Sequence, residues 1–227
     1  MIGIIGAMHE EVVELTELLK NKSVMKEAGM DFYMGLLNDK EVVVVEGGIG
    51  KVNAAVCTTL LINKFNAEKV IFTGVAGGIN PILNVGDIVI SSDLIQHDVD
   101  VTAFGCKFGE IPRMKEYIFK ADKKLAENSY NIAKEKFKEK NVVLGRVLSG
   151  DQFINSIDKI TWLRNEFLGD CVEMEGASVA QVCYLYNKPF VVIRSISDKA
   201  DHSAGVDFNE FKHEAARVSK EIVINIL

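Results

Sequence analysis

Phe190-Val-Val-Ile-Arg-Ser-Ile-Ser197 is an almost uninterrupted apolar run, and it ends at an acidic residue, Asp198. A run of this length and β-branched content predicts a buried strand. Similar short runs alternate along the chain with longer segments of helical periodicity. Strands are predicted over residues 2–6, 42–46, 70–73, 87–91, 142–148 and 190–196, and helices over residues 10–21, 52–65, 121–139, 157–167, 176–186 and 208–226.

This alternation predicts an α/β fold, because helices on both faces keep parallel strands buried. The segment from Phe32 to Val45 is crossed by a turn at Asn38-Asp39, which predicts an antiparallel pair. No low-complexity tract, repeat or evident linker interrupts the chain. We therefore expect a single domain over residues 1–227, with a mixed, mostly parallel central β-sheet flanked by helices on both faces.

The composition favours small-molecule partners. A net charge of -6 argues against a surface for nucleic acid or anionic membrane, since either would need a positive field. No apolar run approaches membrane-spanning length, and the first residues lack the basic start of a signal peptide, so a cytoplasmic, soluble protein is expected. The four cysteines lie far apart without a CxxC pair, which predicts reduced thiols.

Three segments resemble binding motifs but lack the residues that make those motifs work. Gly47-Gly-Ile-Gly-Lys-Val52 is not a P-loop, because Val45 stands at the first glycine position and Val52 replaces the hydroxyl residue that holds magnesium. Gly3-Ile-Ile-Gly6 lacks the spacing of a dinucleotide-binding loop. His97-Asp-Val-Asp100 has no second His or Cys at ligand spacing. We expect neither a cofactor nor a metal ion.

Glu11 is the first candidate catalytic residue. On the predicted first helix it aligns with Met8, Leu15 and Leu18, along an apolar seam and apart from the other acids of that helix. Its place in the first turn, where the helix dipole favours an anion, suits a general base. The alternative is an acid that only complements the helix end.

Asp198 is the second candidate. It follows the last predicted strand, and ligands of α/β sheets gather outside the carboxyl ends of strands. Partial burial would raise the pKa of this carboxyl group, which would suit a general acid at neutral pH. The alternative is an aspartate that caps a turn or helix.

The segment Cys171-Val-Glu-Met-Glu-Gly-Ala177 carries the third candidate, Glu175, at a predicted strand-to-helix junction. A carboxylate there can accept hydrogen bonds from two vicinal hydroxyls, as on a ribose, while Met174 packs against the sugar. The alternative is a core methionine beside an acid at a helix start. Glu173, two residues earlier on the strand, has a less defined supporting role.

Two glycine-rich segments are predicted to be turns that bring backbone amides to the same sheet edge, residues 47–50 and 73–78. The second is predicted to be an anion-binding nest or a plain tight turn. An acid that favours its anion, an acid that favours its neutral form and a diol-binding acid together indicate cleavage of a glycosidic bond. That reaction needs leaving-group protonation on one side and an activated water on the other.

These motifs together resemble the 5'-methylthioadenosine/S-adenosylhomocysteine nucleosidases of the nucleoside phosphorylase superfamily. The resemblance covers nearly the whole chain. Seven blocks carry it in the family's order: Gly3-Ile-Ile-Gly-Ala-Met-His-Glu-Glu11, Gly48-Ile-Gly-Lys-Val52, Thr73-Gly-Val-Ala-Gly-Gly78, His97-Asp-Val-Asp-Val-Thr-Ala-Phe104, Ser149-Gly-Asp-Gln-Phe-Ile154, Val172-Glu-Met-Glu175 and Arg194-Ser-Ile-Ser-Asp198.

The resemblance implies that Asp198 protonates N7 of adenine, that Glu11 activates the attacking water, and that Glu175 holds the ribose hydroxyls. It also implies a substrate that is an adenosyl thioether and a homodimer as the active form. Further binding residues would be Glu173 and Met174 near the sugar, Phe153 and Ile154 at the base, Ser197 beside Asp198, Arg194 near Glu11, the segment Val75, Ala76 and Gly77, the pocket residues Met8, Ile49 and Phe208, and Phe104 and Pro112, which would reach into the partner's 5'-alkylthio pocket.

Two departures from the family pattern bear on substrate breadth. Val75 stands where many members have a serine, so a hydroxyl contact to water is lost or replaced. Gly176-Ala-Ser178 follows Glu175, and members with this variant include some that also cleave 6-amino-6-deoxyfutalosine. Activity on that nucleoside and on 5'-deoxyadenosine is therefore included in the expectation.

Two other functions compete with hydrolysis. A purine nucleoside phosphorylase needs cationic groups for its phosphate, and the first arginine of this chain is Arg113, outside both glycine-rich segments. A nucleoside-binding protein without catalysis would not need both Glu11 and Asp198. Hydrolysis is therefore the favoured function.

Overall fold

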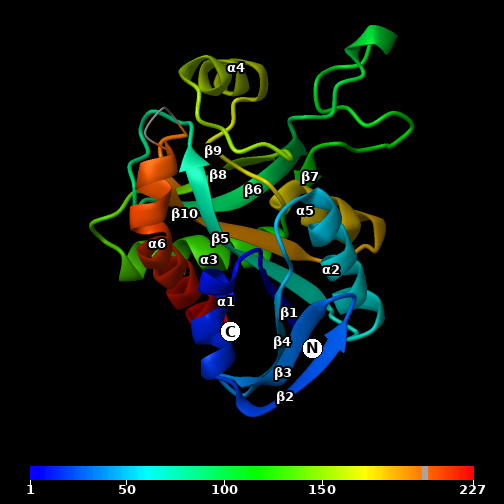
Figure 1. The fold of residues 1–227 in the computed structure, drawn as a ribbon, viewed down its shortest axis with the longest axis vertical. Coiled ribbons are helices and arrows are strands. Elements are labelled where there is room, and N and C mark those ends of the chain that lie inside the picture. Colours follow the sequence, from blue (N-terminus) through cyan, green and yellow to red (C-terminus); the bar gives the residue numbers. More distant parts are fainter. Residues whose placement is uncertain (201–203) are drawn as a thin grey trace.

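Every residue of strand β10 (Phe190–Asp198) is buried. β10 runs parallel to β5 (Lys69–Gly78), β5 to β1 (Ile2–Gly6), and β1 to β4 (Lys40–Glu46). These four parallel strands form the centre of the sheet in the computed structural model, which describes residues 1–200 and 204–227 (Figure 1). The sheet therefore has the parallel centre that the apolar runs predict.

Antiparallel strands extend this centre on both sides. The predicted hairpin is confirmed: β3 (Met30–Leu37) pairs antiparallel with β4, and the turn residues Asn38 and Asp39 have positive φ angles of 49° and 58°. On the other side β5, β10, β6 (Ile88–Gln96), β8 (Val142–Ser149) and β9 (Cys171–Glu173) form a closed ring, each paired with the next. A short strand, β7 (Phe119–Lys120), pairs with β6. The sheet is mixed, as expected.

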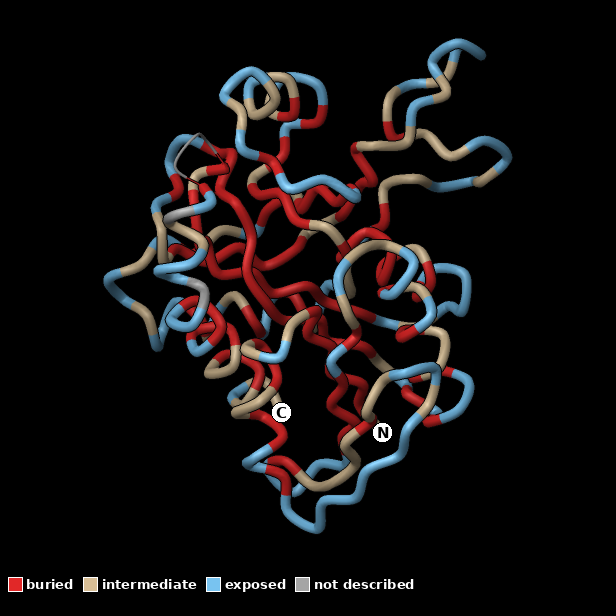
Figure 2. The backbone as a smooth tube through the Cα atoms, viewed as in Figure 1, coloured by how far each residue is buried: buried red, intermediate tan, exposed pale blue. Residues whose placement is uncertain are grey.

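Helices cover both faces of the sheet (Figure 1). Side chains of α2 and α5 pack with one face in the largest apolar cluster, and side chains of α3, α6 and α1 pack with the other. The strands between them are the most buried part of the chain (Figure 2). None of the helices in the two described ranges is long and apolar enough to cross a membrane. The helices are α1 (His9–Glu17), α2 (Lys51–Asn63), α3 (Lys123–Lys136), α4 (Ile157–Phe167), α5 (Gly176–Leu185), α6 (Ala204–Ile226) and a short 3₁₀ turn, η1 (Thr102–Phe104).

The first helix ends earlier than predicted. It stops at Glu17, and residues 20–27 form the edge strand β2 (Lys20–Glu27), which pairs with β3. Asn21 has a positive φ of 54°, which an α-helix does not accommodate. Nearly all of β2 is exposed and rich in lysine, so it lacks the apolar pattern by which a strand is identified.

The segment from Thr73 to Gly78 was predicted to be a glycine-rich turn, and the structure corrects this prediction. It is the end of β5, and all six residues are buried. Its glycines leave room for the side chains around them. A β-carbon on Gly77 would lie 2.9 Å from a carboxylate oxygen of Asp198, and one on Gly74 would collide with the Glu11 carboxylate. The two glycines therefore leave room beside the end of β5 for the carboxylates of Glu11 and Asp198.

Candidate active site

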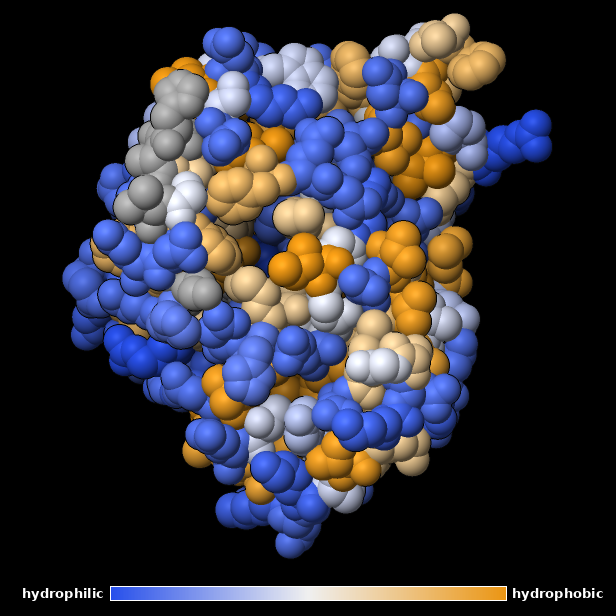
Figure 3. Space-filling view, in the orientation of Figure 1, coloured by the Kyte–Doolittle hydropathy of each residue, from blue (hydrophilic) through white to orange (hydrophobic). Residues whose placement is uncertain are grey.

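A cavity of about 240 Å³ lies at the carboxyl ends of β1, β5 and β10. Figure 3 shows a hollow near the middle of one face of the molecule, bordered by apolar side chains. Fourteen of the predicted site residues line the cavity: Met8, Glu11, Ile49, Val75, Ala76, Gly77, Phe153, Ile154, Glu173, Met174, Glu175, Ser197, Asp198 and Phe208.

Glu11 reaches the cavity from the first turn of α1 and is only 4% exposed. One carboxylate oxygen, Oε2, accepts hydrogen bonds from the amides of Ala7 (2.6 Å) and Met8 (3.0 Å). The other, Oε1, accepts one from the amide of Val75 at 3.1 Å. Three fixed donors thus hold the carboxylate in one orientation, and Val75 contributes through its backbone although its side chain has no hydroxyl.

The pKa of Glu11 is raised, which corrects the expectation of an environment that favours the anion. Burial raises the pKa, while the positive charge of Arg194 and the three backbone amides lower it. Burial has the larger effect. A carboxylate with a raised pKa is a stronger base than an exposed one, so the correction strengthens the chemical case for Glu11 as a base.

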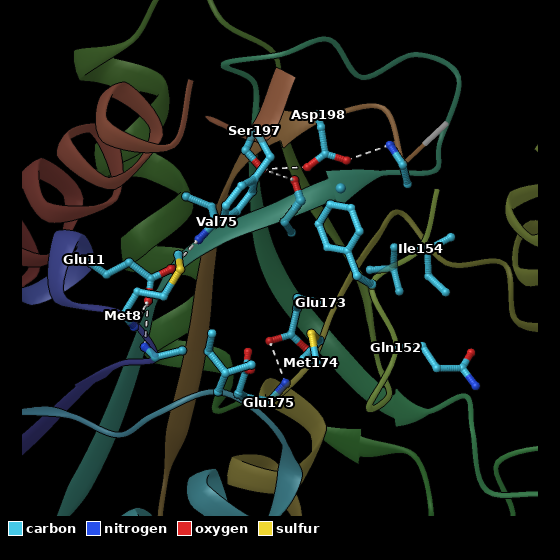
Figure 4. A pocket seen from close by; sticks show the side chains of 18 residues that line it. Met8, Glu11, Val75, Gln152, Ile154, Glu173, Met174, Glu175, Ser197 and Asp198 are labelled. Atoms are coloured by element: carbon cyan, nitrogen blue, oxygen red, sulfur yellow. Dashed lines mark hydrogen bonds between the residues drawn. The ribbon is translucent and has the colours of Figure 1, made fainter. Parts of the chain in front are cut away.

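Asp198 ends β10 and is 3% exposed, more deeply buried than the sequence suggests. The Ser197 hydroxyl donates to its Oδ2 at 2.8 Å, and the Ala200 amide donates to its Oδ1 at 2.8 Å. Figure 4 shows Asp198 and Ser197 on one side of the cavity and Glu11 on another. The two acids can therefore act on different parts of one ligand.

Glu175 lies immediately before α5, and its Oε1 accepts a hydrogen bond from the Gly50 amide at 2.8 Å. Burial raises the pKa of Glu175 to about 8, with a further contribution from the negative charge of Glu173. The three acids approach the cavity from three sides (Figure 4).

Glu173 and Arg194 form a buried ion pair at 2.5 Å. Glu173 also accepts a hydrogen bond from the Gly176 amide at 2.8 Å and another from the Ser149 hydroxyl, so its carboxylate is engaged by the protein although it borders the cavity. The Arg194 guanidinium stacks on Phe72, with 3.9 Å between its central carbon and the ring centroid. Arg194 is not part of the cavity lining. It lies behind the lining, where its charge acts on Glu11 and Glu175.

Aromatic and aliphatic side chains form the rest of the lining. Phe153 and Phe208 meet edge to face at a centroid distance of 5.9 Å, and Phe153 is half-exposed. Ile154 follows from the same loop and is buried. This wall offers a planar ring one apolar face to contact.

Phe104 and Pro112 do not line the cavity of their own chain. Both lie on the projecting segment between β6 and β7, and Phe104 is 87% exposed (Figure 1). Residues that border the cavity without having been predicted are Ala7, Gln152, Val172 and Ala200. Ala7, Gln152 and Val172 are each adjacent in sequence to a predicted residue, and Ala200 lies two residues after Asp198, so closeness in sequence could have identified all four. In the described part of the chain no group of His, Cys, Asp and Glu is arranged to hold a metal ion.

The model of the phosphorylase superfamily matches residues 1–227, so the chain belongs to that superfamily. A curated relative from Staphylococcus haemolyticus, a 5'-methylthioadenosine/S-adenosylhomocysteine nucleosidase, is 45% identical over 100% of this chain and 99% of its own. Within the superfamily, the chain is a member of this nucleosidase family and thus a glycosyl hydrolase.

Solved structures agree with this assignment. The nucleosidase of Neisseria meningitidis in complex with methylthio-immucillin-A superposes with a TM-score of 0.95 at 40% identity, covering 99% of this chain and 97% of that one. A futalosine hydrolase of Helicobacter pylori superposes with a TM-score of 0.94 at 36% identity, covering 99% and 96%. The fold is therefore the nucleoside phosphorylase-like α/β fold that the sequence predicts.

Proposed function

We propose that this protein hydrolyses the N-glycosidic bond of 5'-methylthioadenosine and S-adenosylhomocysteine, releasing adenine and the 5-thioribose product. One observation carries the proposal. Three buried carboxylates, Glu11, Glu175 and Asp198, border one cavity and have different surroundings. The relatives named above supply the substrate class, since they carry these two nucleosides in their names.

Glu11 is the proposed base that activates water. Its Oε2 accepts two amide hydrogen bonds and its Oε1 accepts one, so Oε1 keeps the greater capacity to bind a water molecule. Taking the water's proton is favoured by the raised pKa of Glu11. The positive charge of Arg194 behind the lining counteracts part of this rise in the pKa of Glu11.

Asp198 is the proposed acid that protonates N7 of adenine as the bond breaks. Protonation at N7 turns the base into a neutral leaving group, so the sugar can approach an oxocarbenium ion. The Ser197 hydroxyl and the Ala200 amide orient the Asp198 carboxyl group. In this assignment Phe153 stacks on the base and the Ile154 backbone contacts its edge.

Glu175 is the proposed acceptor for the ribose hydroxyls, with Met174 against the sugar. Its second oxygen, Oε2, is not the acceptor for Gly50, so it can take a hydroxyl while Oε1 stays bound to the loop. Because burial raises its pKa to about 8, this carboxyl group holds a proton more readily than an exposed glutamate does. Sugar hydroxyls would stabilise its charged form.

Phosphorolysis is the competing reaction, and the composition of the cavity disfavours it. The described lining contains no arginine or lysine. A phosphate nucleophile would need such a cation, and it would be repelled by Glu11.

We also propose a second activity on 6-amino-6-deoxyfutalosine and on 5'-deoxyadenosine. Similarity to a futalosine hydrolase supports the first of these, together with the Gly176-Ala-Ser178 sequence after Glu175. The specificity constants for methylthioadenosine, S-adenosylhomocysteine, 6-amino-6-deoxyfutalosine and 5'-deoxyadenosine, measured side by side, would rank these substrates.

The functional unit that we propose is a homodimer of single-domain chains in the cytoplasm. The large exposed apolar side chain of Phe104 supports a partner on the β6–β7 segment. Phe104 and Pro112 would then complete the partner's 5'-alkylthio pocket. In a mixture of Phe104→Ala and Asp198→Asn proteins, exchange of subunits would create one complete site per heterodimer, so activity should rise above that of either variant alone.

Adenine release from methylthioadenosine, measured with and without phosphate, tests the proposed function. Equal release in both conditions is expected. Release only with phosphate would establish phosphorolysis instead, and no release from any adenosyl thioether would indicate a binding protein.

A further inference from the structure

Asp98 connects its own segment to two others, at Lys51 and Asp151, whose neighbours in sequence line the cavity. Its Oδ1 accepts a hydrogen bond from the Lys51 ammonium group at 2.7 Å, and its Oδ2 accepts one from the Asp151 amide at 3.0 Å. The side chains of Asp98 and Lys51 are only 15% and 20% exposed. Asp98 itself does not border the cavity.

The two segments that Asp98 contacts also contact each other. The Lys51 amide, in the first turn of α2, donates to Asp151 Oδ1 at 2.8 Å. The preceding amide, Gly50, donates to Glu175. Phe153 and Ile154 follow two and three residues after Asp151 and line the cavity. The Asp98 carboxylate is therefore linked to two loops. One carries Phe153 and Ile154, the proposed contacts to adenine, and the other carries Gly50, whose amide binds Glu175, the proposed ligand of the ribose.

Close packing at Gly150 gives independent support for this connection. A β-carbon at Gly150 would lie 2.5 Å from His97 Nε2 and 3.1 Å from the Asp98 carboxyl carbon. The loop that begins at Gly150 thus rests directly on residues 97 and 98, and only glycine fits there.

Asp98 is charged in this setting. Burial raises its pKa, but the hydrogen bonds from Lys51 and Asp151 and the charge of Lys51 outweigh burial, so the pKa is lowered. An exposed ion pair would contribute little, because solvent screens it. This pair is mostly shielded and shares its carboxylate with a backbone amide, which makes its geometry better defined.

We propose that Asp98, together with Lys51, is a positioning residue for substrate affinity: it holds the 150–154 loop and the Gly50 amide in register with Glu175. This inference rests on the proposed nucleosidase function. It assigns to the His97-Asp98 motif a role in arranging the walls that contact base and sugar. Such a role affects the bound substrate and the transition state alike, so its loss raises KM and leaves kcat nearly unchanged.

The test compares Asp98→Asn and Lys51→Met with the conservative variant Lys51→Arg. We expect KM for methylthioadenosine to rise about tenfold in the first two variants, with kcat within about threefold of the original protein. Lys51→Arg keeps the ion pair and should retain a KM near the original. The double variant should be little worse than either single variant, because both remove the same interaction.

Asp93→Asn is the matched control. Asp93 forms an ion pair with Arg146 at 2.5 Å, with exposures of 19% and 25%, and neither residue borders the cavity. This variant should lower the melting temperature without changing KM. Equal KM values for Asp98→Asn, Lys51→Met and Asp93→Asn would overturn the inference, as would a fall in kcat at constant KM.

Direct titration with adenine separates this inference from the proposed function. If the original protein binds adenine but does not cleave methylthioadenosine, the proposed function fails. The affinity of the Asp98→Asn variant for adenine then still tests the positioning role. Weaker adenine binding by about tenfold supports that role. Unchanged binding contradicts it, even in a protein whose nucleosidase activity is established.

Discussion

The Glu11 and Asp198 sides of the cavity both hold a buried acid, but they hold it with different partners. The carboxylate of Glu11 accepts hydrogen bonds from three backbone amides, which are donors in every state of the enzyme. Asp198 has a hydroxyl among its partners, that of Ser197. A hydroxyl can turn and accept a hydrogen bond once the acid is protonated, whereas an amide cannot. The amides therefore stabilise Glu11 as the anion that a base must be before it takes a proton, while the hydroxyl also suits Asp198 in the protonated form that an acid must have before it gives one.

Replacing Asp198 by Asn should have the largest effect, because asparagine keeps the shape of the side chain but has no acidic proton. We expect kcat to fall about 10⁴-fold, or about 5.5 kcal/mol of transition-state stabilisation, with substrate affinity changed much less. Single-turnover adenine release and direct titration would measure both. Near-normal turnover would show that the leaving group is protonated by another residue.

Replacing Glu11 by Gln should reduce kcat by about 10³-fold, because the amide cannot accept the water's proton. Glu17→Gln is the control, since Glu17 lies on the exposed face of the same helix. It should leave kcat unchanged. If both variants behaved alike, the difference between the two sides of α1 would have no catalytic meaning.

Ser197→Ala tests the role of the hydroxyl more finely. We expect about a tenfold loss of kcat, because Asp198 keeps its hydrogen bond from the Ala200 amide and loses the one from the Ser197 hydroxyl. The acid side of the pH–rate profile should be retained. An unchanged rate would remove the distinction between hydroxyl and amide partners.

The smallest expected effect concerns Glu175, and it is a change in the stability of the ligand-free protein with pH. Its pKa in the folded protein, about 8, is higher than the ordinary value of 4.5, so between these values the folded state binds more protons than the unfolded state. Its contribution to stability is therefore present at low pH and is lost as the pH rises toward about 8. The melting temperature of the ligand-free protein should fall over this range. The melting temperature of the Glu175→Gln variant should fall less steeply with pH, and identical slopes for the two proteins would contradict the raised pKa.

The sequence predicts the fold correctly where the pattern of apolar and turn-forming residues matches the pattern of burial. The apolar run at Ile193 and the hairpin turn at Asn38 each have one stable arrangement, so both were predicted correctly. Strand β2 was missed because its lysines and serine resemble a loop. The 73–78 segment was missed because glycine signals a turn in general, whereas here it gives space to two acids.

The site was predictable as a set of residue types and less so as a set of contacts. The sequence placed Glu173 and Glu175 together, but only the folded chain shows that Arg194 pairs with Glu173 and leaves Glu175 toward the cavity. The pKa of Glu11 depends on a balance between burial and Arg194, which is 183 residues later in the chain and cannot be weighed from local pattern.

The identity of the sugar product formed in the presence of phosphate tests the central claim most directly. If Glu11 activates water in a cavity without a cation for phosphate, mass spectrometry of the reaction with methylthioadenosine should show the unphosphorylated 5-methylthioribose. A sugar 1-phosphate as the main product would contradict the account.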